Sequence, residues 1–252
     1  MPTINSKFDK VFNAFVLAGM FLAILFTTVS GFIEADSGRA SLLIAAFGSL
    51  MGILCVLCSA NGKIFTFLFG VFDVSIYAGI CFFNWKNGGA GLGNALINGL
   101  YFLPMQFYGF FQWKKRGADS EHGLKARRFT PKQYAMFSMI FLAGTIVAYF
   151  ILAAFDKDVS AGFLKVAVLM DAISMVCNFI GQFLLSSAYM EQWIFWIIVN
   201  VSSTVMWVIS FKEMGDTYSA IYAFKYFFYL LNSINGLRIW IGLSKGTESL
   251  DN

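Results

Sequence analysis

Long uncharged stretches fill almost the whole chain and are separated by short charged segments. A helix that crosses the hydrocarbon core of a membrane needs about 20 mostly apolar residues. Eight stretches meet this requirement, namely residues 11–33, 40–62, 64–85, 87–113, 133–155, 166–190, 192–211 and 217–244. Residues 194–199 are apolar on every face, and the two-residue alternation of a membrane barrel is absent. The pattern predicts an all-α membrane protein with eight transmembrane helices.

The charged segments between these stretches predict the orientation of the helices. If the N-terminus is cytoplasmic, the inner segments hold most of the lysines and arginines, seven of them in residues 114–132. Acidic residues such as Glu34, Asp36, Asp156 and Asp158 then lie outside. Because positive charge favours the cytoplasmic side, we expect both termini there. We interpret residues 114–132 as an anchor beside anionic lipid and not as a nucleic-acid site.

The composition narrows the class of protein. Hydrophobic residues make up 58% of the chain and charged residues 13%, whereas a soluble domain carries about 25% charged residues. These values exclude a cytosolic enzyme, a disordered chain and a secreted disulfide scaffold. Cys55 and Cys58 form an isolated CxxC pair, and His122 lies in a charged loop. Because a zinc site needs further ligands at set spacings, we expect no metal and no cofactor.

An internal repeat places the second, third and fourth helices onto the sixth, seventh and eighth. At one constant shift along the sequence, Asp73-Val74-Ser75 falls on Asn200-Val201-Ser202, and Gly109 and Trp113 fall on Gly236 and Trp240. One helix separates the two triplets, so they share one orientation. The sequence thus predicts a parallel 3+1+3 repeat core plus one extra N-terminal helix. Such repeats occur in secondary transporters, where substrate binds near the midplane.

This organisation divides the chain into five segments. They are an extra transmembrane helix (1–39), a first three-helix bundle (40–113), a basic loop with a linker helix (114–165), a second three-helix bundle (166–244) and a polar tail (245–252).

Polar residues within the apolar stretches are candidates for a substrate site, because a charged group in a membrane helix needs a partner or a wet cavity. Asp73 lies near the middle of its helix and is expected to face the interior. Trp193, Trp196 and Asn200 are spaced i, i+3 and i+7, so they share a helix face. Lys225 and Arg238 lie nearer the helix ends, where long side chains can reach the interface.

Two further predicted helices carry polar residues at helical spacing. They are residues 87–113, with Asn94, Asn98 and Tyr101, and residues 217–244, with Lys225, Tyr229 and Asn232. The complete set of candidate substrate-binding residues is Asp73, Asn98, Tyr101, Gln106, Gln192, Trp193, Trp196, Asn200, Tyr229 and Asn232. Aromatic walls, several amides and one carboxylate suit a flat, cationic ring that carries a hydroxylated group.

Three motifs resemble the PnuC family of vitamin transporters, which usually carry nicotinamide riboside. They are Gln192-Trp193-x-x-Trp196-x-x-x-Asn200, the segment from Asn94 to Trp113, and Asn232-x-x-Asn235-Gly236-x-x-x-Trp240. The resemblance covers roughly residues 40–243, and the Trp-x-x-Trp-x-x-x-Asn motif is its most specific part.

The resemblance implies a fold related to SWEET transporters and a homotrimer in the bacterial inner membrane. It also implies facilitated diffusion of nicotinamide riboside, made unidirectional by a cytoplasmic riboside kinase. On this basis Trp193 and Trp196 would contact the ring. The carboxamide or the ribose hydroxyls would be bound by Gln106, Gln192, Asn200 and Asn232. Asp73 would complement the positive charge.

Three alternatives remain at this point. A related carrier could take thiamine, which also has a flat cationic ring. A membrane-embedded enzyme is disfavoured because G-x-S-x-G, H-E-x-x-H and the phosphate-binding lysine loop are all absent. A recognition subunit of a larger transporter is disfavoured by the internal repeat.

Overall fold

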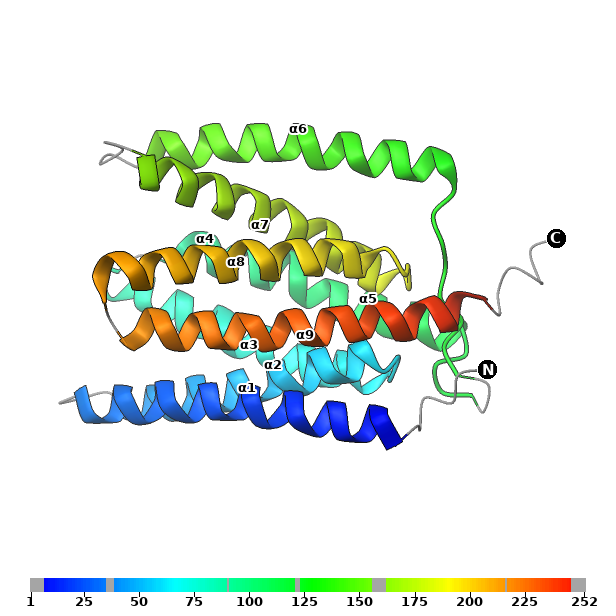
Figure 1. Ribbon diagram of the computed structural model, residues 1–252, viewed down its shortest axis with the longest axis horizontal. Helices are drawn as coiled ribbons and strands as arrows, with labels where there is room; N and C mark the ends of the chain where they lie inside the picture. The colour runs from blue at the N-terminus through cyan, green and yellow to red at the C-terminus, as the bar shows by residue number, and fades with distance from the viewer. Residues whose placement is uncertain are drawn as a thin grey trace.

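The computed structural model describes residues 7–34, 39–89, 91–120, 123–155, 162–215 and 217–245. In this part of the chain the long helices run roughly along one common direction (Figure 1). The elements are α1 (Lys7–Glu34), α2 (Arg39–Ala60), α3 (Phe65–Lys86), α4 (Leu92–Ile97), η1 (Asn98–Phe102), α5 (Leu103–Lys115), α6 (Pro131–Phe155), α7 (Gly162–Ser186), α8 (Gln192–Met214) and α9 (Thr217–Lys245). The all-helical class predicted from the sequence is confirmed.

Six of the described helices are long and apolar enough to cross a membrane, namely α1, α2, α3, α6, α7 and α8. Two more rods complete the eight predicted from the sequence. The elements α4, η1 and α5 follow one another directly and form one interrupted rod. The last rod is α9, which has 29 residues and carries more polar side chains than the others. The chain is a multi-pass membrane protein.

The interruption at η1 has a local cause. The π-helix ends at Phe102, just before Pro104, whose ring nitrogen has no hydrogen to donate to the carbonyl of Leu100. The wider turn accommodates this missing bond. The same rod starts at Leu92 and not at residue 87 as predicted, because Gly88 and Gly91 have φ values of 83° and 145° and form a turn.

The helix packing follows the predicted triplets. Within the first, α2 packs on α3, and α3 packs on α4 and α5; within the second, α7 packs on α8, and α8 packs on α9. Two contacts, α2 with α9 and α5 with α7, join the triplets. Under the repeat predicted from the sequence, α2 corresponds to α7 and the α5 rod corresponds to α9, so these two contacts would be equivalent to each other.

Two tryptophans at matching positions of the repeat bind across the boundary between the triplets. The indole Nε1 of Trp113 on α5 donates to the carbonyl of Leu185 on α7 over 2.7 Å. The indole Nε1 of Trp240 on α9 donates to the carbonyl of Ser59 on α2 over 3.0 Å. Both side chains are fully buried, and their rings lie 5.3 Å apart. These paired contacts support the parallel repeat, which stays a prediction.

The helices outside the triplets occupy different places. The linker helix α6 packs on α7 at one side of the bundle (Figure 1). The N-terminal helix α1 packs on both α2 and α9 and so contacts both triplets. Helix α1 begins and α9 ends at the same end of the bundle, as an even number of crossings requires (Figure 1).

The basic loop before α6 is folded against the turn between α7 and α8. Its residues Leu124, Ala126 and Phe129 are buried. The amide of Arg127 donates to the carbonyl of Ala188 over 2.7 Å, and the amide of Met190 donates to the carbonyl of Arg127 over 2.9 Å. The loop thus has a structural role that its charge did not predict. His122 lies outside the described residues.

Candidate functional site

Among the candidate residues, three buried amide side chains carry polar atoms without a hydrogen-bond partner in the described part of the chain. They are Gln106 on α5, Gln192 on α8 and Asn232 on α9, each at most 3% exposed. Both side-chain polar atoms of Gln192, Oε1 of Gln106 and Oδ1 of Asn232 are unpaired. A buried polar group without a partner costs about 1–3 kcal/mol, so native proteins keep few of them. These atoms can bond a bound molecule.

Gln106 and Asn232 reach the same segment of α2 from different triplets. The side chain of Gln106 passes over Gly70 of α3, where a Cβ would collide with it and would lie 3.3 Å from Sγ of Cys55. Nδ2 of Asn232 donates to the carbonyl of Val56 over 3.2 Å. Because Cys55 and Val56 are adjacent, the two amides converge on one place in α2. This segment of α2 was not identified from the sequence as part of the site.

In the predicted stripe on α8, Trp193 and Asn200 are buried and Trp196 is half-buried, but the three side chains face two different helices. The ring of Trp193 packs against α9, where a Cβ at Gly236 would lie 2.6 Å from it. Nδ2 of Asn200 also reaches α9 and donates to Oγ of Ser233 over 2.9 Å. Trp196 instead lies against α7, where a Cβ at Gly181 would be 3.2 Å from its ring. The stripe therefore touches helices on both sides of α8.

Trp193 is also part of the protein core. It is 3% exposed and belongs to a buried cluster with Phe67, Trp113 and Trp240. Its ring centre lies 6.2 Å from that of Trp240, and its Nε1 has no partner among the described residues. One edge of the indole thus packs in the core, while its N–H remains available.

The structure does not bring Asn98 and Tyr101 to these amides by any described contact. Nδ2 of Asn98 donates to the carbonyl of Asn94 in its own helix over 2.8 Å. The hydroxyl of Tyr101 donates to the carbonyl of Phe179 on α7 over 2.7 Å, and the two rings lie 4.9 Å apart. These contacts tie the interrupted rod to α7. A substrate role for either residue stays a prediction.

Asp73 and Tyr229 lie beside the same segment of α2. A Cβ at Gly52 would be 3.1 Å from Oδ1 of Asp73, so this carboxylate faces α2. Tyr229 packs against the buried cluster that includes Ile53 of α2. Asp73 therefore points into the protein, as its position in the sequence predicts.

The repeat contains a signal for one residue that inspection of single helices missed. Ser233, which bonds Asn200, is the repeat mate of Gln106, because it follows Gln106 at the same distance in sequence at which Asn200 follows Asp73. Both members of the Asn200–Ser233 hydrogen bond are thus repeat mates of candidate site residues. Extending the repeat to Gln106 would have identified Ser233.

Glu191 is a second buried polar residue that sequence reasoning missed. It is 1% exposed, and its Oε1 accepts from the amide of Phe129 over 2.9 Å and from the hydroxyl of Tyr134 over 3.0 Å. It lies directly before Gln192 at the start of α8. Glu191 therefore fixes the basic loop against the end of α8 that carries the site.

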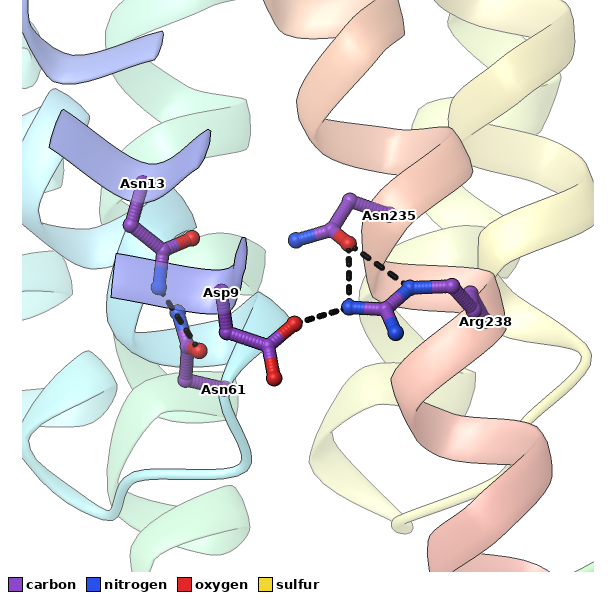
Figure 2. A network of polar contacts seen from close by, with 5 residues as sticks. All are labelled: Asp9, Asn13, Asn61, Asn235 and Arg238. Atoms are coloured by element: carbon purple, nitrogen blue, oxygen red, sulfur yellow. Dashed lines mark hydrogen bonds and ion pairs between the residues drawn. The ribbon is translucent and has the colours of Figure 1, made fainter. Parts of the chain in front are cut away.

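The other charged residues of interest lie at the end of the bundle where α1 begins. Figure 2 shows Arg238 of α9 pairing with Asp9 of α1 while its Nε and Nη2 donate to Oδ1 of Asn235 over 3.0 and 2.9 Å. Nearby, Nδ2 of Asn13 donates to Oδ1 of Asn61 over 3.0 Å. The Arg238 side chain is 50% exposed, which is compatible with the interfacial position expected from the sequence, and its guanidinium also binds partners within the protein.

The described residues include no group of three potential metal ligands among His, Cys, Asp and Glu. Cys55 and Cys58 are both free thiols. The candidate site therefore consists of aromatic rings, amides and a carboxylate on α3, α5, α8 and α9.

Comparison with known proteins identifies the family. A family model described as nicotinamide mononucleotide transporter matches residues 42–242. The nicotinamide riboside transporter PnuC of Neisseria mucosa is 30% identical over 206 residues, which cover 80% of this chain and 73% of that protein. PnuC of Haemophilus influenzae is 30% identical over 207 residues, covering 81% and 82%.

A solved structure shows the same fold. The crystal structure of the vitamin B3 transporter PnuC aligns with a TM-score of 0.63 and 27% identity, over 92% of each chain. The family match begins after the first helix and includes every candidate site residue. These findings, together with the buried amides between two helical triplets, establish that the chain belongs to the nicotinamide mononucleotide transporter family of membrane proteins.

Proposed function

We propose that this protein carries nicotinamide riboside across the membrane by facilitated diffusion. The observation that carries the proposal is the set of unpaired, buried amide atoms on Gln106, Gln192 and Asn232, contributed by both triplets. The names of the relatives, which are nicotinamide riboside transporters, support this substrate. A carrier whose site lies between two halves can expose it alternately to each side when the halves rock.

The ligand has groups that match the unpaired atoms. Its carboxamide has one donor and one acceptor group, and the free side-chain amide of Gln192 has the same two. Gln106, Asn200 and Asn232 would bind the ribose hydroxyls or share the carboxamide. The pyridinium ring would stack on Trp193 and Trp196, since a desolvated cation over an aromatic face gains about 2 kcal/mol. Asp73 would complement its charge.

The direction of transport would come from chemistry inside the cell. A cytoplasmic kinase that phosphorylates the riboside would add about 1.5 to 2 negative charges, and the product would no longer fit a site for a cation. We place the protein in the bacterial inner membrane with both termini cytoplasmic, since most of its basic residues then lie inside. We further propose a homotrimer, in which lipid-facing apolar side chains would pack between protomers.

Binding to purified protein in detergent tests the site. Tryptophan fluorescence should fall on addition of nicotinamide riboside and remain unchanged with thiamine or riboflavin. Gln106→Met and Gln192→Met should each weaken binding by roughly tenfold, since a hydrogen bond contributes about 0.5–1.5 kcal/mol. Gln112→Met, on the same helix as Gln106, is the matched control and should bind normally.

Uptake into liposomes tests the mode of transport. Uptake that persists without any ion gradient supports facilitated diffusion, whereas uptake that requires a proton gradient contradicts it. If thiamine quenched the tryptophan fluorescence and nicotinamide riboside did not, the proposed substrate would be wrong and thiamine would take its place. Conversion of the riboside by purified protein would make the chain an enzyme and would refute the proposal.

A further inference from the structure

Residues 124–130, which precede α6, contact both helical triplets at one end of the bundle; we call them the bridging segment. On the side of the first triplet, the amide of Lys125 donates to the carbonyl of Arg116 over 3.0 Å, and Nε of Arg116 donates to the carbonyl of Lys125 over 2.6 Å. Arg116 directly follows α5. A Cβ at Gly62, in the turn between α2 and α3, would lie 3.9 Å from Cβ of Leu124.

The bridging segment is also bonded to the second triplet. Besides the two backbone bonds of Arg127 to the turn before α8, the amide of Phe129 donates to Oε1 of Glu191 over 2.9 Å. Nε of Arg128 donates to Oγ of Ser244, near the end of α9, over 2.9 Å. Glu191 and Ser244 are each 1% exposed, whereas the side-chain bond of Arg116 is exposed to solvent. Since contacts that solvent reaches open more easily, the second triplet holds the segment more firmly.

The bridging segment closes off the aromatic end of the candidate site. Its buried residues Leu124 and Ala126 belong to the same cluster as three tryptophans near the helix ends, namely Trp113, Trp193 and Trp240. Gln106 precedes Trp113 on α5 by about two helical turns, and Asn232 precedes Trp240 on α9 by about the same distance. A ligand that left these amides toward this end would meet first the tryptophans and then the bridging segment.

Rocking of the two triplets cannot preserve all of these contacts. When two halves of a carrier move apart at one end, a segment bonded to both must part from one of them. The contacts with Arg116 and Gly62 are the ones to open, because those with α8 and α9 use buried partners. In this structure both sets of contacts are present, so the segment lies across the boundary between the triplets.

We propose that the bridging segment is the gate of the carrier at this end and that it is closed in this structure. It moves with α8 and α9, and it separates from Arg116 and Gly62 when the site opens to this end. The inference rests on the proposed function, because a gate requires a ligand that passes it. Glu191 and Ser244 then join the gate to the half of the carrier with which it moves.

A disulfide across the contact that opens tests the gate. Disulfide-bonded residues have Cβ atoms about 3.5–4.5 Å apart, and the Cβ positions at Gly62 and Leu124 are 3.9 Å apart. Gly62→Cys with Leu124→Cys should therefore cross-link on oxidation. The cross-link should abolish uptake of labelled nicotinamide riboside into liposomes, and reduction should restore it. Binding in detergent, followed by tryptophan fluorescence, should persist because the site can still open to the other end.

Matched variants separate the cross-link from the substitutions. Gly62→Ser with Leu124→Ser has side chains of similar size that cannot form a disulfide, so its uptake should be the same under oxidising and reducing conditions. Gly62→Cys alone tests whether the new thiol pairs with one of the four native free cysteines. Oxidation should leave its uptake unchanged.

A second disulfide tests which triplet carries the gate. Arg127 and Tyr189 form a parallel β-bridge, so their Cα atoms lie about 4.8 Å apart, within the range for a disulfide. Arg127→Cys with Tyr189→Cys would join the gate to the half with which it moves. Its oxidised form should therefore transport as fast as its reduced form.

Three results would overturn the inference. They are uptake that persists in the fully cross-linked 62–124 variant, loss of ligand binding in that cross-linked variant, and uptake by the 127–189 variant that falls on oxidation. If the variants at Gly62 fail to fold, Leu124→Cys alone decides the question. Because Leu124 is 3% exposed, a thiol there should react with a water-soluble maleimide faster during transport than without ligand, and an unchanged rate would refute the gate.

Failure of the proposed function itself gives a different result. The unmodified protein would then neither bind nicotinamide riboside nor take it up, under oxidising or reducing conditions.

Discussion

The contact between Gly236 and Trp193 gives the sharpest test of the packing at the site. A Cβ added at Gly236 would lie 2.6 Å from two ring atoms of Trp193, whereas ordinary contacts begin at 3.4 Å. The ring would have to move by the difference, 3.4 − 2.6 = 0.8 Å. It has little room, because its other neighbours include the fully buried Trp240. Overpacking of this kind costs about 1–3 kcal/mol.

Gly79 on α3 supplies the matched control, because nothing lies within 4 Å of a Cβ placed there. Both Gly236→Ala and Gly79→Ala gain the same helix propensity, so their difference isolates the clash. For a protein of this size about 1–3 kcal/mol corresponds to a melting temperature lower by roughly 2 to 12 °C in Gly236→Ala than in Gly79→Ala. Thermal unfolding in detergent, followed by the loss of monodisperse protein, measures this difference.

The same pair of variants links packing to ligand binding. A displaced Trp193 ring should weaken binding of nicotinamide riboside in Gly236→Ala, while Gly79→Ala should bind normally. Shortening the ring with Trp193→Phe in the Gly236→Ala background should recover part of the lost stability. Equal melting temperatures for the two alanine variants would show that the helices separate freely at this contact, and the reasoning would be wrong.

Three further predictions concern contacts between the triplets, α1 and the basic loop. Trp113→Phe and Trp240→Phe should each lower the stability in detergent by about 1 kcal/mol, because each removes one indole hydrogen bond, and an unchanged melting temperature would contradict this. Asp9→Asn should make α1 more accessible to protease. The free energy lost should be smaller than that of a fully buried charged hydrogen bond, because the Arg238 side chain is 50% exposed. Unaltered digestion would count against this prediction. Glu191→Gln should speed tryptic cleavage after Arg127 and Arg128, and a cleavage rate equal to that of the unmodified protein would argue that other contacts hold the loop.

The bounds of the helices could be read from charge spacing because the membrane imposes a length. Residues 64–85 were predicted as a span, and the structure has Phe65–Lys86. The span predicted at residues 166–190 is shifted by four residues, since α7 is Gly162–Ser186. The fourth rod also differs, because its predicted start at residue 87 falls in a turn that only the backbone angles of Gly88 and Gly91 reveal. Where glycine allows both a helix and a turn, an uncharged stretch does not define the helix end.

The neighbours of the site residues were harder to predict than the residues themselves. Helical spacing places Trp193, Trp196 and Asn200 on one face, and all three lie against other helices. Spacing within α8 does not say which helix each side chain meets. That depends on where a neighbouring helix has a glycine, at Gly181 of α7 and Gly236 of α9, and these positions meet α8 only after the bundle has folded.

The same limit applies to charged residues in the membrane helices: the sequence predicts the cost of the charge but not the residue that pairs with it. The cost of burying a charge predicts that Arg238 and Lys225 need either a partner or access to the interface, but it does not identify a partner. The partner of Arg238 is Asp9, which is 229 residues away on α1 and lies outside the family match at residues 42–242. Neither the internal repeat nor the family resemblance includes that helix, so neither could identify the pair. Because α1 contacts both α2 and α9, any rocking of the two triplets must either carry this helix with one of them or break contacts such as the Asp9–Arg238 pair.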